Sequence, residues 1–337
     1  MNWEFQNHNH IKQCIYSIVF CFLIMILSTG CQRNEEPITI QGFYFDTFIS
    51  ITFYEPVSDE IKTGCLDLCS YYENLLSVTK EGSDIYRINH SNGNPCTVND
   101  ETMELLQIAF EYARITNGKC DFTIRPVSSL WDFSVPENAE LPEQSKLENA
   151  LQHVNYENVV LAGNTVTLSD SEMQLDLGFI AKGFIADKIS SYLKSQQIEN
   201  CLINLGGNLL LMGSHNNGQP YRIGIEKPFD TTAPIVTMQL TDTSVVTSGV
   251  YQRYFRKNET LYHHLLNSST GYPENNGLLS VTIIGPNSTR CDALSTCCFL
   301  LGLDNGLALI NQSEGYEALF ITEDYEIITS DNFPAYE

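Results

Sequence analysis

The chain has 337 residues, of which 18 are Lys or Arg and 41 are Asp or Glu, so its formal net charge at pH 7 is −23. A hydrophobic fraction of 43% and a charged fraction of 18% exclude a disordered chain or a low-complexity polymer. The excess of acidic residues argues against a nucleic-acid partner, because few cations are present to neutralise a run of phosphates. An anionic substrate would have to be bound by a metal ion, by main-chain amides or by a few well-placed cations.

The first 30 residues have the pattern of a secretory signal peptide. A polar stretch with Lys12 precedes an apolar run over 18–27, which is half of the roughly 20 residues that a spanning helix needs. Small residues then lead directly to Cys31, an arrangement that resembles a bacterial lipobox, whose cysteine is lipidated. The alternative is an ordinary signal peptide followed by a chance cysteine. We expect residues 1–30 to be removed, lipidated Cys31 and a tether over 31–40 to follow, and the protein to be anchored at a membrane of the bacterial cell envelope, facing the periplasm or the exterior.

The rest of the chain alternates between strand and helix patterns. Alternating apolar residues over Ile40–Phe53 predict a strand, and Asp59–Leu76 and Asp100–Ile115 have the spacing of amphipathic helices, the second with Asp100 as its cap. Because strands dominate without the regular spacing of βαβ units, we expect a mixed α+β fold. Further strands are expected at 159–161, 165–168, 173–175, 202–204, 209–212, 222–225, 235–240, 262–266 and 279–284, helices over 181–194 and 292–301, and a closing β pair within 318–328.

Eight cysteines remain in the chain after Cys31. They could form four disulfides in an exported protein. However, Cys65, Cys69, Cys297 and Cys298 lie at apolar helical positions, where cysteine commonly serves as a small core residue. We therefore expect mostly free, buried thiols.

Polar segments that contain glycine interrupt the apolar runs, and each is ambiguous when taken singly. Gly206 and Gly207 fit a tight turn as well as a binding site, with Asn204 and Asn208 expected to shape that turn. Asp292 and Thr296 are four residues apart, so on a helix both could offer an oxygen to one cation, although Asp292 could equally cap the helix. These segments cover 116–126, 175–187, 203–208, 246–271 and 290–296.

The order and wording of the segments resemble the ApbE family of FAD:protein FMN transferases. The matching motifs are Asp-Leu-Gly-x-Ile-Ala-Lys-Gly, Asn-x-Gly-Gly-Asn, Thr-Ser-Gly, His-x-x-x-x-x-Thr-Gly and Asp-Ala-Leu-Ser-Thr, in this order. The resemblance implies one T-fold-related α+β domain over 41–330, with its active site in a cleft between sub-lobes.

The resemblance also implies a reaction and a metal. Family members cut FAD and pass its FMN half to a threonine or serine hydroxyl of a partner protein, releasing AMP, with Mg²⁺ as the cofactor. Carried over to this chain, the metal ligands are Asp292, Thr296 and the main-chain oxygen of Phe179, with Asp292 also counted as catalytic. Oxygen ligands of this kind suit Mg²⁺.

Further roles follow from the same resemblance. His264 matches the general base for the acceptor hydroxyl, for which an imidazole with a pKa of about 6.5 is suited. Lys182 matches a phosphate contact at the start of a helix. The remaining flavin contacts implied are Lys119, Cys120, Asp121, Thr123, Asp176 and Leu265.

Two other functions remain open at this point. A Mg²⁺-dependent FAD pyrophosphatase that yields AMP and free FMN would need the same metal and phosphate contacts, and a lipoprotein that only binds flavin would need fewer of them. The chain lacks the Asp-Gly-x-Thr/Ser-Ser-Ala-Thr type of sequence that the family modifies, so the implied acceptor is another exported protein.

Overall fold

The computed structural model describes residues 36–134, 136, 139–215 and 218–337. The expected signal peptide and the expected lipidation site at Cys31 lie outside these residues. The part from Pro37 to Glu337 combines helices with several antiparallel sheets, which confirms the mixed α+β class. Within the described residues, no helix is both long enough and apolar enough to cross a membrane.

An antiparallel sheet of eight strands forms the centre of this part of the chain. In β2 and β6, alternate residues are buried, whereas every residue of β13 is buried, because β13 lies in the interior of the sheet and both of its faces are covered. The strands, in spatial order, are β1 (Ile38–Tyr44), β2 (Thr47–Phe53), β6 (Cys201–Leu205), β7 (Asn208–Met212), β10 (Thr243–Gly249), β13 (Leu278–Gly285), β14 (Glu317–Thr322) and β15 (Ile327–Thr329).

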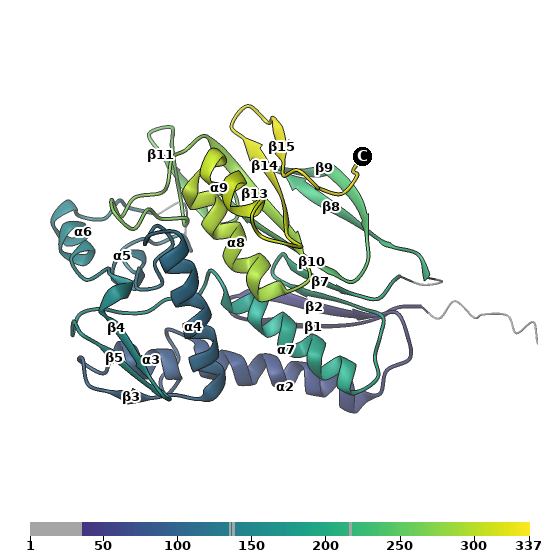
Figure 1. Ribbon diagram of the computed structural model, residues 1–337, viewed down its shortest axis with the longest axis horizontal. Helices are drawn as coiled ribbons and strands as arrows, with labels where there is room; N and C mark the ends of the chain where they lie inside the picture. The colour runs from purple at the N-terminus through teal and green to yellow at the C-terminus, as the bar shows by residue number, and fades with distance from the viewer. Residues whose placement is uncertain (1–35, 135, 137–138, 216–217) are drawn as a thin grey trace, which may run out of the picture. The chain divides into compact units, whose positions relative to one another are not determined.

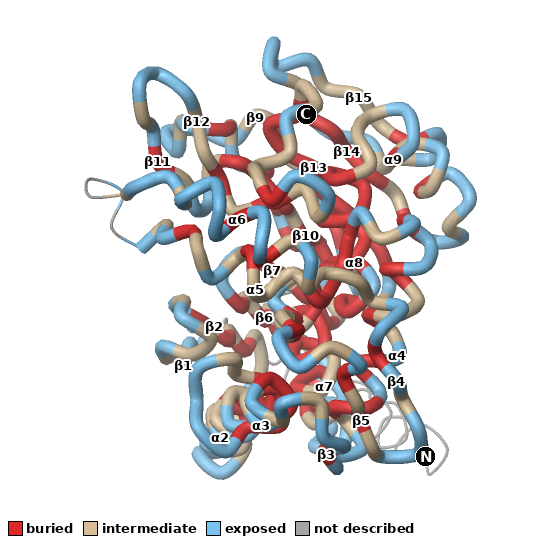
Figure 2. The backbone as a smooth tube through the Cα atoms, turned by 90° about the vertical axis from the view of Figure 1, so that its left-hand side faces the viewer, coloured by how far each residue is buried: buried red, intermediate tan, exposed pale blue. Residues whose placement is uncertain are grey.

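Helices cover one face of this sheet: α2 (Asp59–Leu76), α7 (Ala181–Ser195), α8 (Ser288–Leu301) and α9 (Leu303–Ile310) (Figure 1). Helix α8 packs against β10, β13 and α7, and twelve of its residues are buried, including five with a hydroxyl or carboxyl group. Figure 2 shows the buried stretches gathered around α8, β10 and β13. A helix buried on all sides has no polar face, which is why its periodicity is weak.

Smaller elements occupy the segments between the main strands. They are α3 (Asp84–Asn89), α4 (Asp100–Ile115), α5 (Arg125–Ser128), α6 (Gln144–Leu151), a 3₁₀ turn (Tyr156–Asn158), a sheet of β3 (Cys96–Thr97), β5 (Thr165–Leu168) and β4 (Val159–Ala162), and two hairpins, β8 (Tyr221–Lys227) with β9 (Asp230–Leu240) and β11 (Tyr254–Lys257) with β12 (Thr260–His263).

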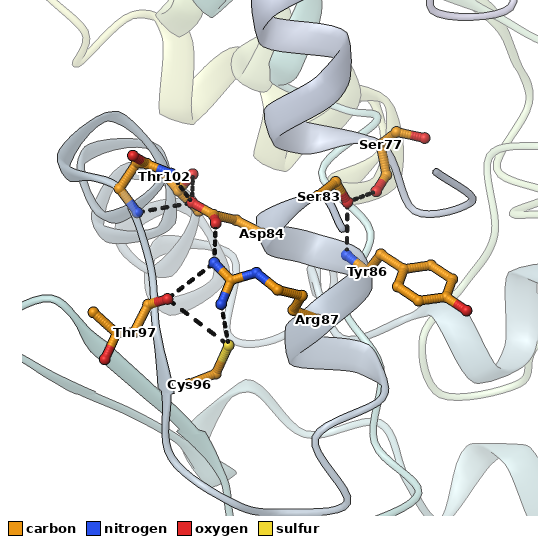
Figure 3. A network of polar contacts seen from close by, with 9 residues as sticks. Ser77, Ser83, Asp84, Tyr86, Arg87, Cys96, Thr97 and Thr102 are labelled. Carbon is orange, nitrogen blue, oxygen red and sulfur yellow. Dashed lines mark hydrogen bonds and ion pairs between the residues drawn. The ribbon is translucent and has the colours of Figure 1, made fainter. Parts of the chain in front are cut away.

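A buried carboxylate joins α3 to the start of α4 (Figure 3). Asp84 accepts hydrogen bonds from the main-chain and side-chain nitrogens of Asn99 at 2.8 and 3.0 Å and from Thr102 Oγ1 at 2.7 Å, and it pairs with Arg87. Burial alone would raise the pKa of Asp84, but these donors outweigh it and lower the pKa. The network fixes the loop that precedes α4.

Several expectations about individual elements are corrected. The expected strand over Ile40–Phe53 is two strands, because Phe45 and Asp46 adopt positive φ angles of 55° each and form a hairpin turn. The run 173–175 forms only an isolated bridge between Gln174 and Ile124. The cap of α4 is Asn99 rather than Asp100, and α8 begins at Ser288, four residues before Asp292.

The eight cysteines of the described residues are all free and buried. They are Cys65, Cys69, Cys96, Cys120, Cys201, Cys291, Cys297 and Cys298. The expectation of buried thiols is therefore confirmed.

Candidate active site

The start of α7 lies directly against α8. The Gly183 main-chain N–H, in the first turn of α7, donates a hydrogen bond of 2.8 Å to Asp292 Oδ2. The first N–H groups of a helix have no partner within the helix, and Ile180, at the N-cap position of α7, has no side chain that could accept one. The carboxylate of Asp292 therefore caps α7 from the neighbouring helix, where it also faces the positive end of the helix dipole.

A second carboxylate links the same two helices, but here it belongs to α7 and accepts from the start of α8. Asp187 of α7 accepts hydrogen bonds from the main-chain nitrogens of Ser288 (3.0 Å) and Thr289 (2.8 Å) at the start of α8, and from Thr289 Oγ1 (2.6 Å) and Asn287 Nδ2 (2.7 Å). Each helix thus supplies a carboxylate to the N-terminus of the other.

Asp292 is a buried carboxylate with few partners for its charge. Burial raises the pKa of Asp292, while Lys182, the Gly183 N–H and Asn208 oppose the rise. The Lys182 ammonium lies 4.0 Å from Asp292 Oδ1 and 3.5 Å from the main-chain oxygen of Gly178. Asn208 Nδ2 is buried and has no hydrogen-bond partner of normal length among the described residues. A divalent cation at Asp292 would offset the cost of burying this charge.

Thr296 lies one turn after Asp292 on α8, as its spacing predicts. Its Oγ1 is 3.0 Å from Ser248 Oγ on β10, and Ser248 Oγ is 2.8 Å from Ser295 Oγ. Ser295 Oγ donates to the main-chain oxygen of Asp292 at 2.8 Å. All four side chains are buried, and Thr296 and Ser248 keep the largest exposed fractions, 8% and 7%.

Phe179 lies two residues before the first residue of α7. The turn that carries it is closed by the main-chain N–H groups of Ile180 and Ala181, which donate to the Leu177 oxygen at 3.1 and 2.9 Å. The next residues, Lys182 and Gly183, contact Asp292, so the segment of Phe179 and the Asp292–Thr296 helix are brought together.

The donor set predicted for the metal consists of one carboxylate, one hydroxyl and one main-chain oxygen. Within the described residues, no group of three or more His, Cys, Asp and Glu side chains could hold a metal ion. A sparse set of oxygen donors is what Mg²⁺ takes when waters and substrate phosphates complete its octahedron. The residues present therefore fit Mg²⁺ and do not fit a metal that needs a complete cage of side chains.

The ring of His264 is held by one main-chain oxygen. Its Nδ1 is 3.3 Å from the Arg253 oxygen. A carbonyl only accepts, so Nδ1 carries the proton and Nε2 keeps its lone pair. Burial, with the charges of Arg253, His263 and Lys182, lowers the pKa of His264 below its usual 6.5. The ring is therefore neutral at neutral pH.

The neighbouring histidine, His263, uses both of its ring nitrogens. Its Nε2 lies 3.2 Å from the Glu274 oxygen, and its Nδ1 accepts from the Leu265 N–H at 3.3 Å. The ring packs edge-on against Phe299. His263 is thus a core residue.

Of the predicted flavin contacts, Asp121 and Thr123 are engaged with their own surroundings. Asp121 Oδ1 accepts from the Thr123 main-chain nitrogen at 2.8 Å and from Thr123 Oγ1 at 2.7 Å, and Oδ2 accepts from the Tyr156 N–H at 2.9 Å. Burial raises the pKa of Asp121. Both side chains are buried, and these bonds give them a part in holding the segment that carries them.

Asp176 is the more accessible carboxylate of this group. It accepts from the Gly178 N–H at 2.9 Å and from Ser128 Oγ at 3.3 Å, and it lies 3.9 Å from Arg125. Its own N–H donates to the Phe122 oxygen at 2.8 Å, which joins the segment at 116–126 to the turn that carries Phe179.

The other predicted flavin contacts differ in exposure. Lys119 is exposed, whereas Cys120 and Leu265 are buried. The segment that follows His264 returns to Lys119, because Ser268 Oγ donates to the Gly118 oxygen at 2.7 Å. Segments about 150 residues apart in the chain therefore meet here.

Two surface depressions of the described part of the chain lie beside other residues than those predicted for the site. One of about 370 Å³ lies beside α5 and α6 and includes Pro126 and His153. The other, of about 270 Å³, includes Asp187, Lys194 and Met212. Neither is lined by a residue that the sequence predicts for the site.

Three residues with defined contacts were not predicted for the site: Asp187, Asn208 and Ser248. All three lie in or beside the motifs quoted above, so the sequence indicated these positions. It did not indicate their hydrogen-bond partners. Asn204 does shape the glycine turn, as expected, because its Oδ1 accepts from the Gly207 N–H at 2.9 Å. Asn208 instead accepts from Ser288 Oγ at 2.8 Å and faces the start of α8.

Comparison with known proteins places this arrangement in a family. Residues 45–320 match the ApbE family. The chain belongs to the ApbE family. The resemblance inferred from the motifs is thereby confirmed.

Relatives and solved structures agree with this assignment. The chain is 37% identical to an FAD:protein FMN transferase of Klebsiella pneumoniae over 78% of this chain and 82% of the relative. It is 33% identical to an FAD:protein FMN transferase of Treponema pallidum, over 95% and 94%. The crystal structure of the ApbE protein of Thermotoga maritima matches with a TM-score of 0.81 at 30% identity, over 88% of this chain and 98% of that one. The flavin transferase ApbE of Vibrio cholerae matches with a TM-score of 0.80 at 27% identity, over 88% and 98%.

Proposed function

We propose that this ApbE family member is an FAD:protein FMN transferase that moves FMN from FAD to a threonine or serine hydroxyl of an acceptor protein and releases AMP. The observation that carries the proposal is the contact between two motifs: the Lys182 ammonium lies 4.0 Å from Asp292 Oδ1, and the Gly183 N–H donates to Asp292 Oδ2 at 2.8 Å. A cation can stabilise phosphate charge, a carboxylate can hold Mg²⁺, and a neutral imidazole can take the proton of a hydroxyl. The names of the relatives support the same activity.

The chain's own residues divide the work as follows. Nε2 of His264 takes the proton of the acceptor hydroxyl while the new O–P bond forms at the FMN phosphorus. The bond from that phosphorus to the bridging oxygen breaks, and AMP leaves with that oxygen. Lys182 stabilises phosphate charge at the start of α7, where the helix dipole also favours an anion.

Asp292, Thr296 and the main-chain oxygen of Phe179 would hold Mg²⁺ in this proposal. When bound, the ion neutralises charge on the diphosphate and orients it for in-line attack. In a chain of net charge −23, this would be the dominant local positive charge.

The proposal includes the location of the protein. With its signal peptide removed and Cys31 lipidated, the domain would be held at the bacterial cell envelope, where its acceptor would be another exported protein. Mass spectrometry of the mature N-terminus tests this part, and an unmodified Cys31 in a protein recovered from the membrane would contradict it.

The activity is tested with purified protein, FAD and Mg²⁺, with and without a peptide that carries an Asp-Gly-x-Thr/Ser-Ser-Ala-Thr sequence. Release of AMP that depends on the peptide, together with an FMN adduct on its threonine or serine, is the expected result. Release of AMP without the peptide indicates the pyrophosphatase, and FAD binding without release of AMP indicates a binding protein. Either of these two results contradicts the proposal.

A further inference from the structure

The hydroxyl groups of Ser248, Ser295 and Thr296 form a hydrogen-bond chain, and the donor of each hydrogen bond in it follows from the others. Ser295 Oγ donates its single proton to the main-chain oxygen of Asp292. The 2.8 Å bond between Ser248 and Ser295 must therefore be donated by Ser248. With that proton used, the 3.0 Å bond between Ser248 and Thr296 must be donated by Thr296.

This direction has a consequence for the free side of Thr296. Its proton is turned toward Ser248 on β10, so the remaining lone pairs of Oγ1 point away from the strand. A cation is attracted by lone pairs and repelled by an O–H proton. We propose that Ser248 is a positioning residue that accepts the Thr296 proton and thereby presents the Thr296 oxygen as a ready ligand for the divalent cation.

Burial makes the arrangement hard to replace by solvent. Ser295 is completely buried, and Ser248 is 7% exposed. Without Ser248, the Thr296 hydroxyl lacks its acceptor on the strand and can turn to the carbonyl one turn earlier in its own helix, as threonine hydroxyls commonly do. Partners of this kind behind a metal ligand typically change metal affinity by about 10–100-fold.

The chain offers a matched control on the same strand. Thr247 Oγ1 lies 2.8 Å from Thr282 Oγ1, so this pair has the same chemistry as Ser248 with Thr296. Because adjacent residues of a strand point to opposite faces, Thr247 faces away from α8. Thr247→Val therefore removes a hydroxyl from β10 but leaves the hydrogen-bond chain of Ser248, Ser295 and Thr296 intact.

The role of Ser248 rests on the proposed function, because that function supplies the Mg²⁺ ion. Its test, however, measures Mg²⁺ binding and does not need catalytic turnover. Binding of Mg²⁺ alone is followed by isothermal titration calorimetry on the whole protein, with near-ultraviolet circular dichroism as the check of fold. We expect Ser248→Ala to raise the Mg²⁺ dissociation constant by about 10-fold or more, Ser295→Ala to raise it less, because Ser248 can still accept from Thr296, and Thr247→Val to leave it within about twofold.

The outcomes separate the inference from the proposed function. A native fold with unchanged Mg²⁺ affinity in Ser248→Ala overturns the inference, and so does an equal loss in Thr247→Val. Wild-type protein that binds no Mg²⁺ overturns it as well, whether or not FMN is transferred. Wild-type protein that binds Mg²⁺ and follows the expected order of variants, but transfers no FMN, contradicts the proposed function and leaves the role of Ser248 standing.

Discussion

Replacing Gly183 by alanine tests how closely α7 and α8 are held. A Cβ at Gly183 would lie 2.2 Å from the main-chain oxygen of Ser288 and 2.8 Å from Asp292 Cβ. Ordinary contact begins at 3.4 Å, so the helices would have to separate by about 1.2 Å. The obstacle is backbone, which cannot rotate away.

The magnitude follows from three contributions. Overpacking typically costs about 1–3 kcal/mol, and a lost hydrogen bond to a charged group about 1.5–3 kcal/mol. Against this, exchanging glycine for alanine in a helix gains at most about 1 kcal/mol. We expect Gly183→Ala to lower the free energy of unfolding by about 1.5–5 kcal/mol and to reduce AMP release.

Gly64→Ala is the matched control. Gly64 also lies within a helix, α2, and a Cβ there would lie 2.1 Å from Tyr192 Oη. This obstacle is the far end of a half-exposed side chain that can turn aside, so the change in stability should stay within about 1 kcal/mol of zero. Urea unfolding of the metal-free protein measures both variants. Equal stability of Gly183→Ala and wild type would refute the close approach of the two helices.

Three further predictions concern single groups. Burial raises the pKa of Asp292, so the folded state holds this proton more tightly than the unfolded state, and the ionised group costs stability above that pKa. Metal-free Asp292→Asn should therefore be more stable than wild type at pH 8, with an advantage that shrinks toward pH 4 in urea titrations, while AMP release falls roughly a thousandfold; a constant difference across pH would contradict this. His264→Ala should impair transfer by about 100-fold or more with little change in FAD affinity. Because the pKa of His264 is lowered in the wild-type protein, the rate of transfer should fall with acid only below pH 6.5. A fall that begins above this value would exclude His264 as the base. Asp84→Ala should lower the free energy of unfolding by about 2–4 kcal/mol in urea, because it leaves the buried Thr102 hydroxyl and the Asn99 N–H without their acceptor. A loss under about 1 kcal/mol would show that the network contributes little.

Local sequence was sufficient for the helices that have one polar face. The bounds expected for α2 and α4 agree with the structure, because their buried residues recur at helical spacing and the chain beyond each helix favours a turn. The bounds of α8 could not be found in this way. Its buried face goes around the whole helix, so neither the periodicity nor a polar residue such as Asp292 marked where it begins.

The site shows the same division. The motifs predicted which segments carry chemistry, and the pairing of Asp292 with Thr296 follows from a spacing of four. The contacts between distant segments could not be predicted from local sequence patterns, because Ser248 and Thr296 are 48 residues apart and Gly183 and Asp292 are 109 residues apart. The split of Ile40–Phe53 was missed for a different reason: Phe45 and Asp46 are not the residues that usually mark a two-residue turn.

The reciprocal capping of α7 and α8 explains why a carboxylate is tolerated in this interior. Asp292 completes the first turn of α7 with one oxygen, while the other faces Lys182. Asp187 caps α8 in the same way, because it accepts from the main-chain N–H groups of the first two residues of α8. The two helices cannot slide past each other without breaking both caps, so the position of Asp292 relative to the turn of Phe179 is set by the fold before any ligand binds. Such preorganisation favours binding, because the ligands lose little freedom when the cation arrives. The stability lost by burying Asp292 in the metal-free protein is therefore coupled to its readiness to bind metal, and a variant that recovers the first should lose the second.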